Sequence, residues 1–119
     1  ALREAADWWR GPFCDGEAFG AWADDVRDRL RTTQLDALLA HGEAELDAGD
    51  AAAALPAFQR AIAEDPLWEA AHRGVLAALV ALGRRGEAQA HGRRLVERLA
   101  RELDVEPEPE TATLLRTVG

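Results

Sequence analysis

The stretch GEAELDAGDAAAALPAFQRAIAEDP, residues 42–66, decides the fold of this chain of 119 residues. Its apolar residues recur at spacings of three and four, which is the period of helices that each bury one face. Gly49 is placed to stop one helix and Asp50 to cap the next, so the pattern predicts two antiparallel helices. Pro56 lies several residues inside the second helix, where it removes one backbone hydrogen bond. We therefore expect that helix to be bent or to begin late.

A weaker copy of this pattern follows further along the chain. The offset between the copies aligns Gly49 with Gly83, each between paired helices. This offset is the helix-turn-helix period of the tetratricopeptide repeat (TPR), which is about 34 residues. In the first copy Phe58 is expected to fill the gap between the two helices, whereas the second copy has Gly92 at the same place. Two copies are too few for a stable stack, so the flanking segments have to cover its ends.

Helical spacing continues through nearly all of the chain, and no sustained alternation of β-branched residues indicates strands. The expected fold class is therefore all-α, with about two TPR-like antiparallel helical hairpins and flanking capping helices. At the end of the first hairpin, Asp65 is expected to cap a new helix whose first residue is Pro66 and which ends at Gly83. The first helix of this hairpin is expected to cover approximately residues 18–48, and further helices are predicted over approximately residues 2–9, 87–103 and 111–118.

Composition narrows the classes of function. The net charge is −8, and all 14 basic residues are Arg, which argues against a domain that wraps nucleic acid by itself. A single cysteine, Cys14, excludes an internal disulfide and fits a reducing compartment. No apolar run reaches the length of a membrane span. We therefore expect a cytoplasmic protein that contacts other proteins and no membrane.

Aromatic residues gather near the start of the chain. Three of the four Trp and two of the three Phe lie in DWWRGPFCDGEAFGAW, residues 7–22. We expect these aromatics to cap the exposed end of the first helix pair. The alternative is a ligand-sensing regulatory domain in which Trp8, Trp9 and Trp22 form the pocket.

The chain offers little catalytic chemistry. Glu69 and His72 have the Glu-x-x-His spacing of helical di-iron sites, but such sites need this motif twice and it occurs once. His72 is therefore expected to be a packed histidine with one hydrogen-bond partner. The chain has few candidate residues for nucleophilic catalysis, because it has no Ser and Cys14 has no His near it in sequence. We predict no catalytic residue, no metal and no cofactor, and hence no enzymatic activity.

Four segments of the sequence resemble a known family. They are WRGPF at 9–13, DPLxExAHR at 65–73, ALGRRxEA at 81–88 and RELxVEPxPET at 101–111. With them, nearly all of the chain resembles the bacterial transcriptional activation domain (BTAD) of the SARP-type transcriptional regulators, which is TPR-like and all-helical. The chain departs from this family at Pro56, Gly92 and Asp104, where the family tends to have an ordinary helix former, an aromatic residue and Gly.

The resemblance implies that residues 1–119 are a single TPR-like domain and a fragment of a longer regulator. It implies a non-enzymatic protein-interaction domain that supports assembly of a DNA-binding activator and its contact with transcription machinery or regulatory domains. The expected partners are RNA polymerase subunits or other domains of the same regulator, homodimerisation is left open, and a separate N-terminal domain binds the DNA. TPR groove positions, carried over to this chain, nominate Leu39, Glu43, Arg73, Ala77 and Val80.

One predicted helix carries a row of four arginines, Arg93, Arg94, Arg98 and Arg101. This row is a candidate basic face that would touch the DNA backbone or an acidic partner. The alternative is a solvated helix face that is paired with acidic residues at helical spacing. Those acidic residues are Glu97 and Glu102.

Overall fold

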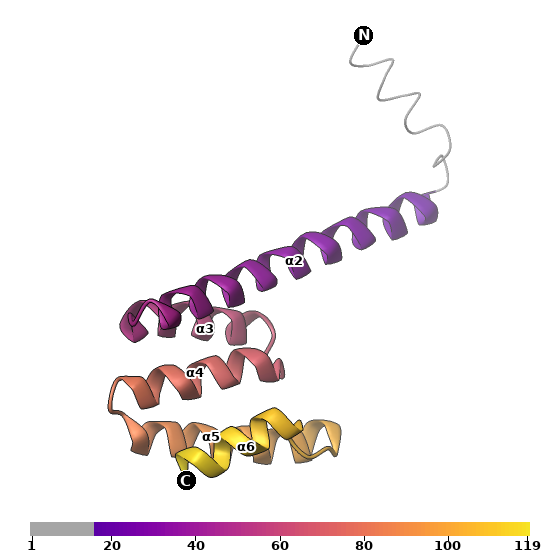
Figure 1. Cartoon of the computed structure of the whole chain (residues 1–119). Coiled ribbons are helices and arrows are strands. Elements are labelled where there is room, and N and C mark those ends of the chain that lie inside the picture. Colours follow the sequence, from indigo (N-terminus) through magenta and orange to yellow (C-terminus); the bar gives the residue numbers. More distant parts are fainter. Residues whose placement is uncertain (1–15) are drawn as a thin grey trace. The chain divides into compact units, whose positions relative to one another are not determined.

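The computed structural model describes residues 16–119, which form helices joined by short turns and contain no strand (Figure 1). The helices are α2 Gly16–Asp47, α3 Ala51–Glu64, α4 Glu69–Ala81, α5 Arg85–Leu103 and α6 Pro109–Val118. The predicted all-α, TPR-like class is confirmed. The chain divides into two units between residues 34 and 35, and the hydrophobic core described below belongs to the second, Leu35–Gly119.

The helical hairpins of the second unit turn as the sequence predicts. Gly49 and Gly83 have φ of +83° and +76°, a left-handed conformation in which a Cβ atom is unfavourable. In both turns the N–H of the following residue donates to the carbonyl five positions earlier, at 2.8 Å. The Asp50 side chain also accepts a hydrogen bond of 3.0 Å from the Ala53 N–H and caps α3. The same turn therefore recurs at the offset that the sequence predicts.

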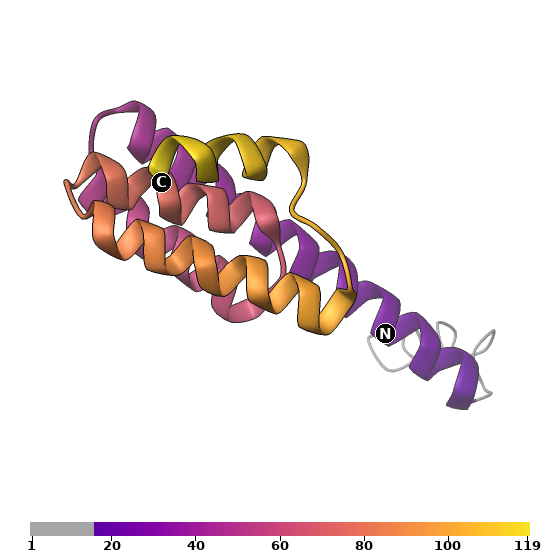
Figure 2. The same cartoon turned by 90° about the horizontal axis from the view of Figure 1, so that it is seen from below.

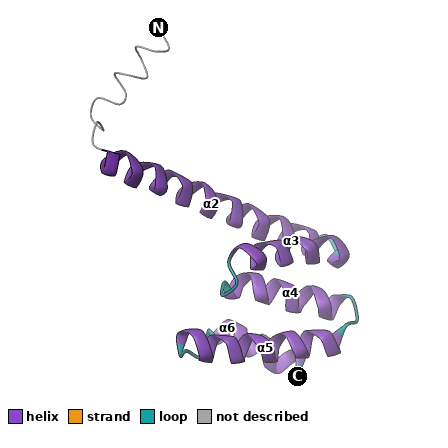
Figure 3. Cartoon of the chain, turned by 180° about the vertical axis from the view of Figure 1, so that it is seen from behind, coloured by secondary structure: helices purple, strands orange, loops and turns teal. Residues whose placement is uncertain are grey.

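Helix α4 is the centre of the second unit. It packs against α3, α5 and α6, and Figure 3 shows α3, α4 and α5 side by side with short loops between them. Apolar residues at helical spacing build the core that these helices share. Its buried members include Ala54, Leu55, Phe58, Val75, Leu76, Ala78, Leu79, Ala88 and Val118.

Phe58 fills the gap between helices, as predicted. Its side chain is completely buried, and it lies against two glycines on two different helices. A Cβ atom built on Gly42 of α2 would lie 2.7 Å from the Phe58 ring, and one built on Gly74 of α4 would lie 2.4 Å from it. Only glycine at these positions lets the three helices approach as closely as they do.

Two helix starts differ from those predicted: the late start of α3, to which a bend at Pro56 was the alternative, and the start of α4 at Pro66. Helix α3 begins directly after its cap, at Ala51, although it contains Pro56. Pro56 is on the exposed side of the helix, where water can bind the carbonyl that the missing N–H leaves free. Asp65 does not cap the next helix, because it ends α3, and Pro66 lies in a tight turn before α4. The Trp68 N–H donates to the Asp65 carbonyl at 3.2 Å, so Pro66 takes the second turn position that proline favours.

Helix α6 returns to the hairpins after a bend at the end of α5. Asp104 ends α5 with φ of +53°, so it adopts the left-handed conformation that glycine favours. Pro109 then stands in the first turn of α6, where its missing N–H costs no hydrogen bond. Figure 2 shows α6 beside α4 and α5, and packing between these helices agrees with that view.

Most of the aromatic cluster at the start of the chain lies outside the described residues. This holds for the helix expected over residues 2–9 and for Trp8 and Trp9, so the cap and the alternative ligand pocket both stay predictions. Phe19 and Trp22 are described, and their ring centroids are 6.0 Å apart on α2. Both are more than one-third exposed. None of the helices within residues 16–119 has the length and apolar character needed to cross a bilayer.

Candidate functional site

The five residues predicted to line a groove come from α2 and α4. Leu39 of α2 and Val80 of α4 are half-buried and pack against the same core cluster. Ala77 is half-buried and Glu43 is exposed. Three of these four residues, Leu39, Ala77 and Val80, are therefore apolar side chains that stay partly exposed on α2 and α4.

Arg73, the fifth of these residues, makes a hydrogen bond and ion pairs with other residues of the chain. One guanidinium nitrogen, Nη1, donates to the Thr111 hydroxyl at 2.9 Å and lies 3.7 Å from a Glu108 carboxylate oxygen. The other, Nη2, lies 3.3 Å from a Glu110 carboxylate oxygen. Thr111 is completely buried, and the Glu108 N–H donates to the Glu69 carboxylate at 2.8 Å. Arg73 and Glu69 thus hold the start of α6 against α4.

The predicted basic face is divided by the geometry of α5. Arg94, Arg98 and Arg101 follow one another at spacings of four and three, and they line a pocket of about 520 Å³ together with His72 and His91. We call this the basic pocket. Its other lining residues are Ile62, Leu95, Glu97 and Glu102. Arg93 does not line it, because one residue along a helix is a rotation of about 100°.

Ion pairing in the basic pocket is incomplete. The Arg98 Nε lies 2.7 Å from a Glu102 carboxylate oxygen, which is the pairing that the solvated-face alternative predicted. Within residues 16–119, neither Arg94 nor Arg101 makes an ion pair, and Glu97 makes none either. Two guanidinium groups therefore stand in the pocket without a carboxylate partner from the described part of the chain.

Two histidines form the floor of the basic pocket. His72 is only 5% exposed, and it has two hydrogen-bond partners where one was predicted. Its Nε2 lies 2.7 Å from the Pro66 carbonyl oxygen, and its Nδ1 lies 2.8 Å from His91 Nε2. A carbonyl can only accept, so His72 Nε2 carries a proton. In the neutral pair, His91 Nε2–H then donates to His72 Nδ1.

Burial keeps both histidines neutral at pH 7. Burial, together with the neighbouring His72 and Arg94, lowers the pKa of His91 to about 4, and burial is the largest of these causes. Burial is also the main cause that lowers the pKa of His72, with a smaller effect of Arg98. The Pro66 carbonyl opposes this shift. Positive charge in the basic pocket thus comes from its arginines and not from its imidazoles.

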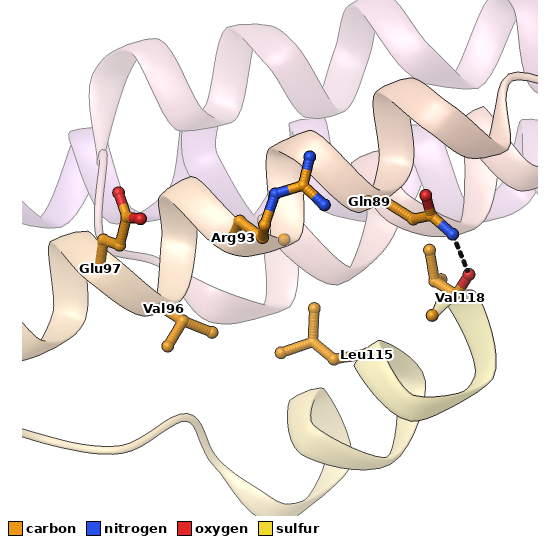
Figure 4. A pocket seen from close by; sticks show the side chains of 8 residues that line it. Gln89, Arg93, Val96, Glu97, Leu115 and Val118 are labelled. Atoms are coloured by element: carbon orange, nitrogen blue, oxygen red, sulfur yellow. Dashed lines mark hydrogen bonds between the residues drawn. The ribbon is translucent and has the colours of Figure 1, made fainter.

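A second pocket, also of about 520 Å³, lies between α5 and α6 (Figure 4). Its apolar lining comes from Gly92, Val96, Leu115 and Val118, and its polar lining residues include Arg93. Figure 4 shows the Leu115 side chain directed from α6 towards α5. The end of α6 is held to α5 by side chains, because Gln89 and Arg85 donate to the Val118 carbonyl at 3.2 and 2.9 Å.

The residues considered for metal binding have other partners. Glu69 accepts the hydrogen bond from Glu108 described above, and His72 is bonded to His91 and Pro66. Within the part of the chain that the structure describes, no group of three or more His, Cys, Asp or Glu is placed to hold a metal ion.

Comparison with known proteins gives one match. A family model described as "Bacterial transcriptional activator domain" matches residues 1–118. No curated protein and no solved structure matches the chain significantly.

Proposed function

Because this chain belongs to the bacterial transcriptional activator domain family, we propose that it is the protein-interaction domain of a SARP-type DNA-binding activator. In this proposal it supports assembly of the activator and contacts RNA polymerase subunits or other domains of the same regulator. A separate domain of the regulator binds the promoter. The domain itself acts in the cytoplasm by binding and without a catalytic step.

The observation that carries this proposal is the partly open apolar surface on the first helices of the hairpins. Leu39, Ala77 and Val80 are half-buried although they are apolar, and burying the rest of such surface is the main favourable term in protein association. Glu43, four residues after Leu39 on α2, is exposed and is a charged residue available to a partner. Arg73 contributes through α6, because its guanidinium is already bonded to that helix.

The test is a change at the centre of this surface. Ala77→Glu places a charge where a partner would bury apolar surface, and Ala100→Glu makes the same change on the exposed side of α5. RNA polymerase subunits and the other domains of the regulator are captured on each immobilised variant, after circular dichroism has shown that both are folded. We expect Ala77→Glu to lose about tenfold or more in affinity, since an unpaired charge buried in an interface is costly.

The Ala100→Glu variant is the matched control and is expected to bind like the unchanged domain. Equal capture by both variants, with the fold intact, would contradict a role for this surface. No capture of any of these proteins by the unchanged domain would contradict the protein-interaction proposal itself.

A further inference from the structure

We propose that the basic pocket binds an extended acidic peptide segment, with side-chain carboxylates bound by Arg94, Arg98 and Arg101. This site is distinct from the surface on α2 and α4 in the proposed function, and it takes a partner of opposite chemistry. Each proposal can therefore fail without the other.

The basic pocket is a concave site with more positive than negative side chains. The pocket has a volume of about 520 Å³ and is lined by three arginines and by two glutamates, Glu97 and Glu102. Arg98 is the only one of the three with a carboxylate partner among the described residues, Glu102. Guanidinium groups bind carboxylates through two parallel hydrogen bonds, so Arg94 and Arg101 keep donors that a bound carboxylate can accept.

The two histidines of the basic pocket carry no charge that competes with the arginines for an anion. His91 faces Arg94, and His72 faces Arg98, and in each case the arginine disfavours a further positive charge on the imidazole. The carboxylates of Asp65 and Glu69 act on His72 in the opposite direction but lie outside the pocket lining. The imidazoles therefore stay neutral, and an anion that binds between the arginines compensates the positive charge of the guanidinium groups, so the pocket favours acidic ligands over neutral ones.

The spacing of the arginines along α5 suits an extended peptide. Arg94 and Arg98 are four residues apart on α5, which is about 6 Å along a helix axis. Alternate side chains of an extended peptide lie on one side of the chain and repeat at about 6.6 Å. Two carboxylates on alternate residues therefore match Arg94 and Arg98, of which Arg98 shares its guanidinium group with Glu102. The net charge of −8 repels every polyanion, and this repulsion is larger for duplex DNA, which carries one negative charge per about 1.7 Å of helix axis, than for a short peptide.

The test measures binding of a fluorescently labelled hexaglutamate peptide to this chain by fluorescence anisotropy, at about 0.15 M salt, where charges more than about 8 Å apart are largely screened. Arg94→Gln combined with Arg101→Gln removes the two unpaired guanidinium groups. Arg60→Gln combined with Arg93→Gln removes the same charge from exposed residues that do not line the pocket. Circular dichroism verifies the fold of both double variants.

We expect the pocket double variant to weaken hexaglutamate binding about tenfold or more, since it removes charge-assisted hydrogen bonds. The control double variant is expected to bind within about twofold of the unchanged chain, as long-range charge is screened. An equal loss in both variants, or no binding to the unchanged chain, would overturn the proposal. Stronger binding of inorganic phosphate or of duplex DNA with the same dependence on Arg94 and Arg101 would also overturn it, in favour of a phosphate site.

Discussion

Leu115 of α6 occupies the space that Gly92 of α5 leaves open. A Cβ atom built on Gly92 would lie 2.5 Å from Leu115 Cδ2. In the second hairpin Gly92 stands at the position that corresponds to Phe58, the buried residue that fills the first hairpin. The second hairpin thus obtains from α6 the apolar group that the first hairpin carries itself.

This relationship predicts coupling between the two positions. Leu115→Ala is expected to lower the free energy of unfolding by about 1–3 kcal/mol, because a half-buried leucine has part of the contacts of a core leucine. Gly92→Phe alone is expected to clash with Leu115. The two changes combined are expected to cost about 0.5–3 kcal/mol less than their sum, measured by urea unfolding. Strict additivity would show that Leu115 does not occupy the position of the missing aromatic.

The contact of Phe58 with Gly74 predicts a second result. Gly74→Ala gains about 1 kcal/mol of helix propensity, but its Cβ would lie 2.4 Å from a completely buried ring. We expect a net loss of about 1–3 kcal/mol in the free energy of unfolding, as for other overpacked cores. Gly86→Ala on α5 is the control, because a Cβ there meets nothing within 4 Å. We expect the midpoint of thermal unfolding to fall for Gly74→Ala and to rise or stay unchanged for Gly86→Ala.

The hydrogen bond from Arg73 to Thr111 predicts a third result. Arg73→Met leaves the buried Thr111 hydroxyl without its donor, which is expected to cost about 1–3 kcal/mol of stability. Adding Thr111→Val removes the orphaned hydroxyl and is expected to recover part of this loss. A double-mutant cycle by chemical denaturation measures the difference. If Thr111→Val costs the same with and without Arg73, the bond contributes nothing to the docking of α6.

The lowered pKa values of the two histidines predict how stability depends on pH. In the folded state the pKa of His91 is about 4, below its ordinary value of 6.5, and that of His72 is lowered too. At pH values between about 4 and 6.5 the unfolded chain binds more protons than the folded chain, so the free energy of unfolding falls as pH falls. We expect this fall between pH 7 and pH 5 in urea titrations. His91→Gln, which can still donate to His72, is expected to show a smaller fall.

The left-handed conformation of Asp104 predicts a stabilising change. A side chain in this conformation costs about 1 kcal/mol that glycine does not incur, and Asp104 is exposed at the end of α5 with φ of +53°. Asp104→Gly is therefore expected to raise the free energy of unfolding by about 0.5–1 kcal/mol. Ala100→Gly, one turn earlier in the helix, is expected to lower it by about the same amount. A loss of stability in both variants would contradict this account of the turn.

Local sequence signals were enough to predict the hairpins. The helix stops at Gly49 and Gly83, the cap at Asp50 and the burial of Phe58 each follow from a residue type at a given spacing, and the structure has all four. The start of α4 was missed because Pro66 is compatible with two positions, the first helical residue and the second turn residue.

The bonding partners of the candidate site residues come from distant segments of the chain, which local sequence patterns do not reveal. Arg73 was nominated as a groove residue, but its partners lie far along the chain, on α6 and in the segment that leads into it. The bond between His72 and His91 likewise joins two helices. The separation of Arg93 from the other three arginines was available in the sequence, because helical rotation places neighbours on different faces.

Phe58 touches Gly42 and Gly74 at once, so one ring sets the spacing of three helices. The three positions therefore have to change together during divergence. Among relatives of this domain, we expect a smaller residue at position 58 to accompany alanine or serine at 42 or 74, and an aromatic to accompany two glycines. A correlation of this kind needs no measurement on the molecule, and an alignment of related sequences would reveal it.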